Sequence, residues 1–406
     1  MRPSHPRRRL SRALTPFLLG LSGLVLSACG GSDGTPIPTL DPQLVAQGKE
    51  IFRQDTFGDE AQWTDTLRMH EVIEQKVTPK VALSVGLKVD SEALPAAVVE
   101  GIQKGTISLD DTKTTLALIQ LGAVVGVKGT VETVAGVERL TKVGITCALC
   151  HSTVDNSFTK GVGKRLDGWA NRDLDPGAII SLSPALTPAQ KAIYASWGKG
   201  KFDPRFNVDG KSKPVVIPPA FGLLGVTKVT FTGDGDEIAY WNRYVSVVEM
   251  GGQGSFSEPR LNLDVVHGTQ DLVSAKLPAL QAYQLSLAAP AAPAGSFDAA
   301  AAERGKVLFL GTAQCVTCHS GATFTDSRLH PPSASMAEPE TPSYASRSAT
   351  KMYRATPLRG NWQHPPYFHD GSAADQEAVV DTYNNRLGLG LSGQEVKDLA
   401  QYLRSL

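Results

Sequence analysis

The chain has 406 residues, of which 41% are hydrophobic and 20% charged, and its 40 basic and 40 acidic residues give a formal net charge of zero. This length favours roughly two to three globular domains. Setting aside the five arginines of the N-terminal leader leaves a mildly acidic chain, which argues against nucleic acid as a partner.

The first 28 residues predict a signal peptide. The leader arginines precede an apolar run, residues 14–26, that is too short to span a bilayer as a permanent helix. The run ends in Leu26-Ser27-Ala28-Cys29, which resembles the lipobox of bacterial lipoproteins; a plain secretory signal is the alternative. We therefore expect residues 29–42 to form a tether from a lipid on Cys29. The protein would then be a membrane-anchored lipoprotein that faces the periplasm of a bacterium.

A weak internal repeat predicts two related helices. Residues 46–52 and 303–309 share the core Gly-Lys-x-(Ile/Leu)-Phe, and a chance match is the alternative. A Cys-x-x-Cys pair follows the second copy at once, but follows the first only about 95 residues later. The intervening segment predicts helical structure within residues 64–75 and a β-hairpin over residues 123–147. We expect residues 43–290 to form a first domain enlarged by an insertion that contains this hairpin.

Two Cys-x-x-Cys-His motifs carry the chemistry. They comprise Cys147, Cys150 and His151, and Cys315, Cys318 and His319. This pattern is the attachment signature of c-type haem, because two cysteines on one helical turn can bond both vinyl groups while the next imidazole falls under the iron. We therefore predict two covalently bound haems with histidine as the proximal ligand of each. Disulfides, a zinc site made from both cysteine pairs and thioredoxin-like redox pairs are alternatives that leave the histidines unexplained.

The C-terminal region, residues 296–406, looks like a class I cytochrome c domain. A predicted helix runs into the second motif, and an amphipathic helix closes the chain. Ser392 and Glu395 form a capping-box pattern, and Val396, Leu399 and Leu403 mark one helix face with Leu406. The predicted fold is therefore mainly α, with two cytochrome c-like haem domains.

The segment that begins at Lys351 reads KMYRATPLRGNWQHPPYFHDGS. Met352, Pro357-Leu358-Arg359 and residues 366–372 resemble the C-terminal signature of the bacterial di-haem cytochrome c peroxidase superfamily. The resemblance implies that Met352 ligates the second haem, and Met336 is the other candidate. It also implies that a calcium ion can lie between the haems, and that the redox partner is a periplasmic electron donor or acceptor protein.

Two more residues are assigned by this resemblance alone. Trp241 would lie between the haems, and Glu249 would be the acid that serves peroxide cleavage. Their spacing is shorter than in the family, and a glycine of the family pattern is missing. The removable histidine that the peroxidases carry after the first motif is also missing. The iron at His151 is thus expected to take His267, Met250 or His70 as its sixth ligand, or to keep an open face for peroxide or oxygen.

Three functions fit these observations. The first is an oxidoreductase resembling di-haem cytochrome c peroxidases, in which electrons pass from the haem at His319 to the haem at His151. The second is a lipoprotein electron carrier whose haems are both six-coordinate. The third is a haem-based sensor. The sixth ligand at His151 distinguishes these functions, because peroxide chemistry needs an accessible iron.

Overall fold

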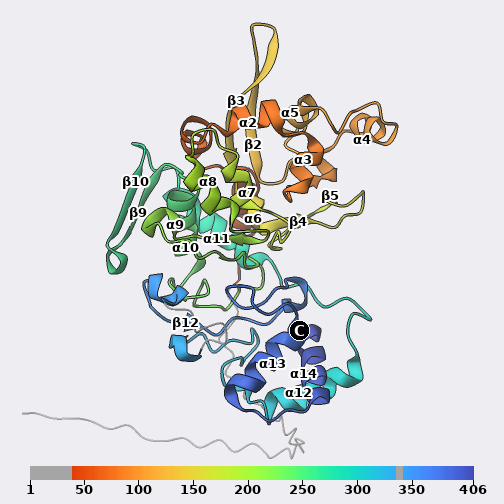
Figure 1. The fold of residues 1–406 in the computed structure, drawn as a ribbon, viewed down its shortest axis with the longest axis vertical. Helices are drawn as coiled ribbons and strands as arrows, with labels where there is room; N and C mark the ends of the chain where they lie inside the picture. Colours follow the sequence, from red (N-terminus) through yellow and green to blue (C-terminus); the bar gives the residue numbers. More distant parts are fainter. Residues whose placement is uncertain (1–38, 335–341) are drawn as a thin grey trace, which may run out of the picture. The chain divides into compact units, whose positions relative to one another are not determined.

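The computed structural model describes residues 39–334 and 342–406. The predicted signal peptide, the lipid site at Cys29 and Met336 therefore lie outside the described residues. Helices predominate in the described part, which confirms the predicted mainly α class (Figure 1). The α-helices are α1 (Pro42–Gln54), α2 (Met69–Lys76), α3 (Pro79–Ser84), α4 (Ala96–Gln103), α5 (Thr112–Gln120), α6 (Ala148–His151), α7 (Pro176–Ser181), α8 (Pro188–Ala195), α9 (Phe206–Asp209), α10 (Ile238–Tyr244), α11 (Leu277–Ser286), α12 (Ala299–Leu310), α13 (Gln376–Leu387) and α14 (Gly393–Ser405).

Every sheet in the described part of the chain has two strands. The parallel pair is β1 (Val89–Asp90) with β5 (Val162–Gly163). The antiparallel pairs are β2 (Val127–Val134) with β3 (Val137–Ile145), β4 (Ser152–Val154) with β6 (Arg165–Asp167), β7 (Lys201–Phe202) with β8 (Val215–Val216), β9 (Gly254–Glu258) with β10 (Leu263–His267), and β11 (Leu329–His330) with β12 (Tyr353–Arg354). Such short strands cannot form a sheet core, so the helices and loops supply it.

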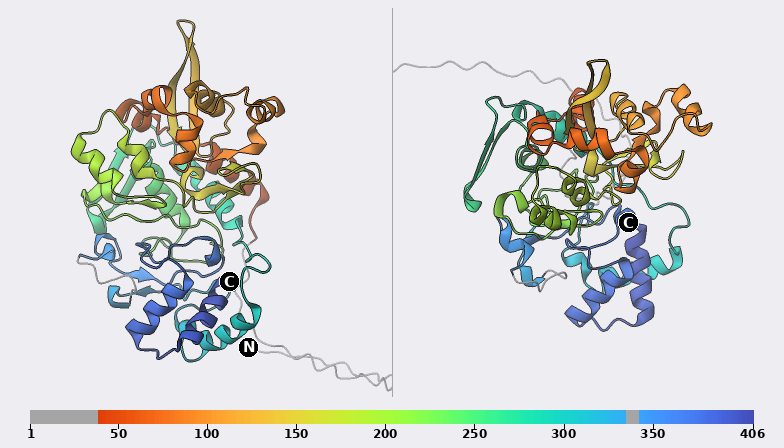
Figure 2. Two further views of the ribbon diagram at one scale, coloured as in Figure 1. Left: turned by 45° about the vertical axis from the view of Figure 1, so that its right-hand side comes forward. Right: turned by 45° about the horizontal axis from the view of Figure 1, so that its top comes forward.

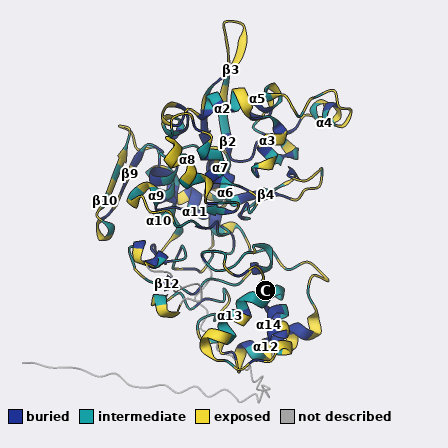
Figure 3. Ribbon diagram, in the orientation of Figure 1, coloured by how far each residue is buried: buried dark blue, intermediate teal, exposed yellow. Residues whose placement is uncertain are grey.

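The longest strand pair is the hairpin β2–β3, which projects beyond the neighbouring helices (Figure 1). Its two-residue turn, Ala135 and Gly136, has φ values of 50° and 80°, as a type I′ turn requires. Figure 3 shows that the hairpin tip is exposed, and Val134 and Val137 are at least half exposed there. The other end of β3 leads directly into the first cysteine motif.

Helices α1 and α11 pack tightly against each other because Gly48 lies at their contact. A Cβ atom at Gly48 would lie 1.9 Å from the Ala279 carbonyl oxygen of α11. One turn further on, the buried Phe52 ring meets the Tyr283 ring edge to face at 5.5 Å. The Asp41 side chain caps α1 by accepting a hydrogen bond from the Gln43 backbone N–H.

Helices α12 and α14 make the same kind of contact. A Cβ atom at Gly305 would lie 2.1 Å from the Asp398 carbonyl oxygen, and the buried Phe309 ring meets the Tyr402 ring edge to face at 5.2 Å. The capping box between Ser392 and Glu395 is present, which confirms the predicted start of α14. The rotated views keep α12 and α14 beside α13 (Figure 2).

Buried apolar side chains gather in separate clusters. One cluster joins α1, α10 and α11 around Phe52 and Leu280, and another joins α12 and α14 around Phe309 and Leu399. A third, which contains Trp63 and Trp197, extends from α2 to α7. None of the helices in residues 39–334 and 342–406 has the length and apolar character needed to cross a membrane.

Candidate haem sites

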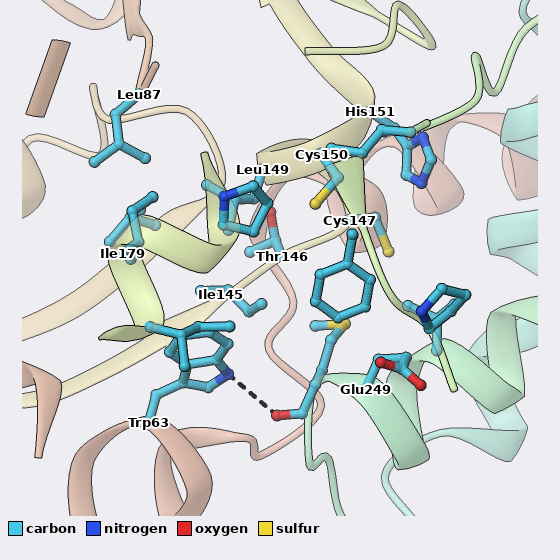
Figure 4. A pocket seen from close by; sticks show the side chains of 18 of the residues that line it. Trp63, Leu87, Ile145, Thr146, Cys147, Leu149, Cys150, His151, Ile179 and Glu249 are labelled. Carbon is cyan, nitrogen blue, oxygen red and sulfur yellow. Dashed lines mark hydrogen bonds between the residues drawn. The ribbon is translucent and has the colours of Figure 1, made fainter. Parts of the chain in front are cut away.

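The first motif lies at the end of β3, where the chain turns from a strand into one helical turn. Cys147 occupies the N-cap position of α6, and the His151 backbone N–H donates to the Cys147 carbonyl oxygen at 3.2 Å. This turn directs the thiols of Cys147 and Cys150 into one cavity (Figure 4). Both thiols are free, so the cysteine pair forms no disulfide.

The His151 ring is oriented by the backbone. Its Nδ1 lies 3.0 Å from the Pro218 carbonyl oxygen, and because a carbonyl can only accept, Nδ1 carries the proton. The unprotonated Nε2 is then available to a metal, which is the usual arrangement of a metal-ligating histidine. Burial lowers the pKa of His151 to about 4, so the ring is neutral at pH 7.

An apolar cavity of about 300 Å³ adjoins this motif. Leucine, isoleucine and valine are the most frequent residues of its wall, which also includes Trp63 and Trp197. Among the described residues that line it, Glu249 is the one carboxyl group and Arg354 the one cationic side chain. A haem is an apolar disc with carboxylates along one edge, so the cavity and the adjacent Cys-x-x-Cys-His motif fit this group.

Glu249 ends the π-helical turn η3 (Val245–Glu249) that continues α10. Within the described chain, neither of its carboxyl oxygens has a hydrogen-bond partner. Burial raises the pKa of Glu249 well above its usual range, which favours the protonated, neutral form of the carboxyl group. The Tyr244 hydroxyl, which acts to lower this pKa, donates to the Pro204 carbonyl oxygen at 2.5 Å. Figure 4 shows the carboxyl group across the pocket from the motif.

The structure also brings Trp241 and Met250 to this cavity. The Trp241 ring stacks on Tyr244 with centroids 4.7 Å apart, and Met250 is held by a hydrogen bond of 3.1 Å from Trp63 Nε1 to its carbonyl oxygen. Of the three sixth-ligand candidates, only Met250 lines the cavity. His70 and His267 do not; His267 lies instead on β10, paired with Gly254.

The second motif forms a similar short turn. Cys315 begins the 3₁₀ turn η6 (Cys315–Thr317), and His319 Nδ1 lies 3.1 Å from the Phe324 carbonyl oxygen. Burial lowers the pKa of His319. Met352 immediately precedes β12, whose partner β11 follows this motif in the chain. The backbone thus orients both histidines in the same way.

A further group of metal-ligating side chains lies beside the second motif. Cys318, Asp326 and His330 have ligand atoms within 4.8 Å of one another. A thioether bond to haem would consume the Cys318 thiol, and two side chains would remain. Within the described residues, the two cysteine pairs do not meet in one cluster, which removes the four-cysteine zinc alternative.

Residues 302–406 match the family model described as cytochrome c. These residues form a cytochrome c domain. Methylamine utilization protein MauG of Methylorubrum extorquens is 32% identical to the chain over 120 residues, which are 26% of this chain and 34% of that protein. The chain therefore spans about a third of the length of this curated relative. These matches confirm the resemblance drawn from the C-terminal signature, and they support covalently bound haem c and a haem-based electron-transfer or peroxidase-like function.

Two solved structures show a weaker likeness. Hydrazine synthase of Kuenenia stuttgartiensis has a TM-score of 0.33 and 19% identity, with coverage of 52% of this chain and 74% of that one. A MauG-like protein associated with microbial copper homeostasis also has a TM-score of 0.33, with 20% identity and coverage of 48% and 74%. Scores at this level do not establish a shared fold beyond the cytochrome c domain.

Proposed function

We propose that the protein is a di-haem c-type cytochrome that accepts electrons at the haem of the cytochrome c domain and reduces peroxide at the haem of the first motif. One observation carries this proposal: the buried acid Glu249 has no hydrogen-bond partner and lies on the cavity lined by Cys147, Cys150 and His151. A buried acid whose protonated form is favoured can give its proton to a leaving oxygen beside a haem site.

The repeated helix contact supports a second haem domain. The α1–α11 pair and the α12–α14 pair each place a glycine against a backbone carbonyl and a phenylalanine against a tyrosine. The glycines, Gly48 and Gly305, and the phenylalanines, Phe52 and Phe309, occupy the same positions of the sequence repeat. We assign residues 43–290 to the first haem domain and residues 296–406 to the second.

The haem would supply one-electron chemistry and a binding position for a peroxide oxygen. Reduction of one hydrogen peroxide consumes two electrons and two protons and yields two waters. Glu249 would give one proton to the departing oxygen as the O–O bond breaks, and it would then be reprotonated from solvent. His151 would hold its ligand geometry through Pro218, and Trp241 would lie on the electron route toward the cavity.

Met250 supports a second candidate function. Met250 lines the same cavity, and its thioether would be the sixth ligand of the iron bound by His151. Both haems would then be six-coordinate, and the protein would be an electron carrier without substrate chemistry. The two functions differ in whether peroxide reaches the iron.

Rapid mixing of the half-reduced protein with hydrogen peroxide separates the two. We expect a high-spin signal at the first haem and fast peroxide reduction, which Glu249→Gln should slow by roughly 10²–10⁴-fold. Glu92→Gln, at an exposed position, is the matched control. Two low-spin haems without peroxide turnover would favour the electron carrier, and an unchanged rate in Glu249→Gln would remove the acid's role.

We further propose that a lipid on Cys29 anchors the protein in a bacterial membrane, facing the periplasm. Its partner would then be a periplasmic electron donor or acceptor protein. A calcium ion between the haems belongs to the same proposal. Mass spectrometry of the purified protein would test the lipid and, after calcium chelation, native mass measurement would test the ion.

A further inference from the structure

Arg354 contributes a guanidinium group to the wall of the first cavity, although it belongs to the cytochrome c domain. Its backbone N–H donates to the Phe231 carbonyl oxygen, and its Nη1 donates to the Lys228 carbonyl oxygen. Its Nε is buried and has no partner among the described residues. The strand β12 and the loop around residue 230 therefore hold the head group at the cavity.

The described part of the chain does not balance the charge of this guanidinium. Arg205 and Arg347, which are also buried, each pair with a buried aspartate, Asp234 and Asp203 respectively. Within the described residues, Arg354 forms no ion pair with a carboxylate. A buried cation without a counter-charge is costly, and the cost is removed when a carboxylate binds.

The ligand of this cavity can supply that carboxylate. A haem carries two propionates on one edge, and a planar guanidinium can bind a carboxylate through two parallel hydrogen bonds. Among the described residues that line the wall, the one carboxyl group is that of Glu249, and it makes no hydrogen bond to Arg354. The polar edge of the haem is therefore expected on the Arg354 side of the cavity.

We propose that Arg354 binds a propionate of the haem held by Cys147, Cys150 and His151. This inference rests on the proposed first haem. It also connects the two haem sites, because Arg354 is two residues from Met352, the predicted ligand of the second iron. The short strand β12 and the residue before it would together contact the acidic edge of one haem and the iron of the other.

Spectroscopic redox titration of the purified di-haem protein tests the inference. In Arg354→Gln the propionate charge is no longer neutralised, which favours the ferric state. We expect the reduction equilibrium constant of the first haem to fall about tenfold, equivalent to a potential about 59 mV lower for a one-electron couple. Arg354→Lys keeps the charge and should stay within about threefold of wild type.

Arg328→Gln is the matched control, because it removes the same charge from an exposed position just before β11. Equal shifts in Arg354→Gln and Arg328→Gln would overturn the inference. So would a wild-type potential that changes with acetate concentration at constant ionic strength, since a solution anion would then occupy the site.

The haem-to-protein ratio separates this inference from the proposed function. A ratio of two with an unshifted potential overturns only the role of Arg354, whereas a ratio of one overturns both. If Arg354→Gln does not accumulate, wild type and Arg354→Lys are compared by infrared difference spectroscopy with isotope-labelled haem propionates. Shifted carboxylate bands support the inference, and identical bands overturn it.

Discussion

Gly48 and Gly305 allow the closest helix contacts of the two proposed haem domains, so adding a methyl group at either one tests the packing directly. In Gly305→Ala the new Cβ would lie 2.1 Å from a backbone oxygen, about 1.3 Å short of the 3.4 Å at which ordinary contact begins. A backbone atom cannot rotate away, so α12 and α14 must separate. Such overpacking costs about 1–3 kcal/mol. The better helix propensity of alanine returns up to about 1 kcal/mol.

We therefore expect Gly305→Ala and Gly48→Ala each to lower the free energy of unfolding by about 1–2 kcal/mol. Urea unfolding followed by circular dichroism measures this free energy. An unchanged slope of the free energy against urea concentration checks two-state behaviour. Gly393→Ala is the control, because a Cβ there meets nothing within 4 Å, and its stability should equal or exceed that of wild type. Wild-type stability in both Gly48→Ala and Gly305→Ala would refute the close-packing argument.

Three further predictions concern charges and ligands. Arg347→Ala leaves the buried Asp203 without its ion-pair partner and should lower the free energy of unfolding in urea by about 3–5 kcal/mol. Loss of the exposed ion pair of Arg68 should lower it by at most about 1 kcal/mol. Burial raises the pKa of Asp59 to about 9, so stability should fall as pH rises from about 4 to 9; Asp59→Asn should flatten this pH dependence, and equal slopes would contradict the assignment. Met352→Ala should lower the potential of the second haem in redox titration, and an unchanged potential would point to another ligand.

Helices α12 and α14 and the cap of α14 could be predicted from the sequence because their signals are local. The capping box at Ser392 and the apolar face that follows it depend on residues within a few turns. The helical structure predicted over residues 64–75 is present, but it is divided between a π-helical segment (Ala61–Thr66) and α2, and the cause of the break is tertiary. Arg68 adopts a left-handed conformation with φ 55°, and the Leu67 carbonyl accepts from Ser183 Oγ at 2.6 Å instead of from a helix turn.

The candidate site was only partly predictable. Spacing alone predicts His151 as a haem ligand, but it does not predict the Pro218 carbonyl that orients the ring. Glu249 was assigned through a family resemblance, and its burial without a partner could not be read from its neighbours in the chain. Arg354 was missed altogether, because no local pattern distinguishes an arginine on a distant cavity wall from one on the surface.

The wall of the first cavity also bears on how independent the two proposed domains are. Tyr344 and Arg354 complete this wall from the C-terminal region, and Arg347 neutralises Asp203 next to it. Deleting the cytochrome c domain would therefore open an apolar cavity and expose a buried charge, besides removing one haem. Met352 directly precedes β12, and Arg354 at the end of this strand lines the first cavity. The cytochrome c domain is thus better understood as part of the wall of the first cavity than as a module joined to it by a linker.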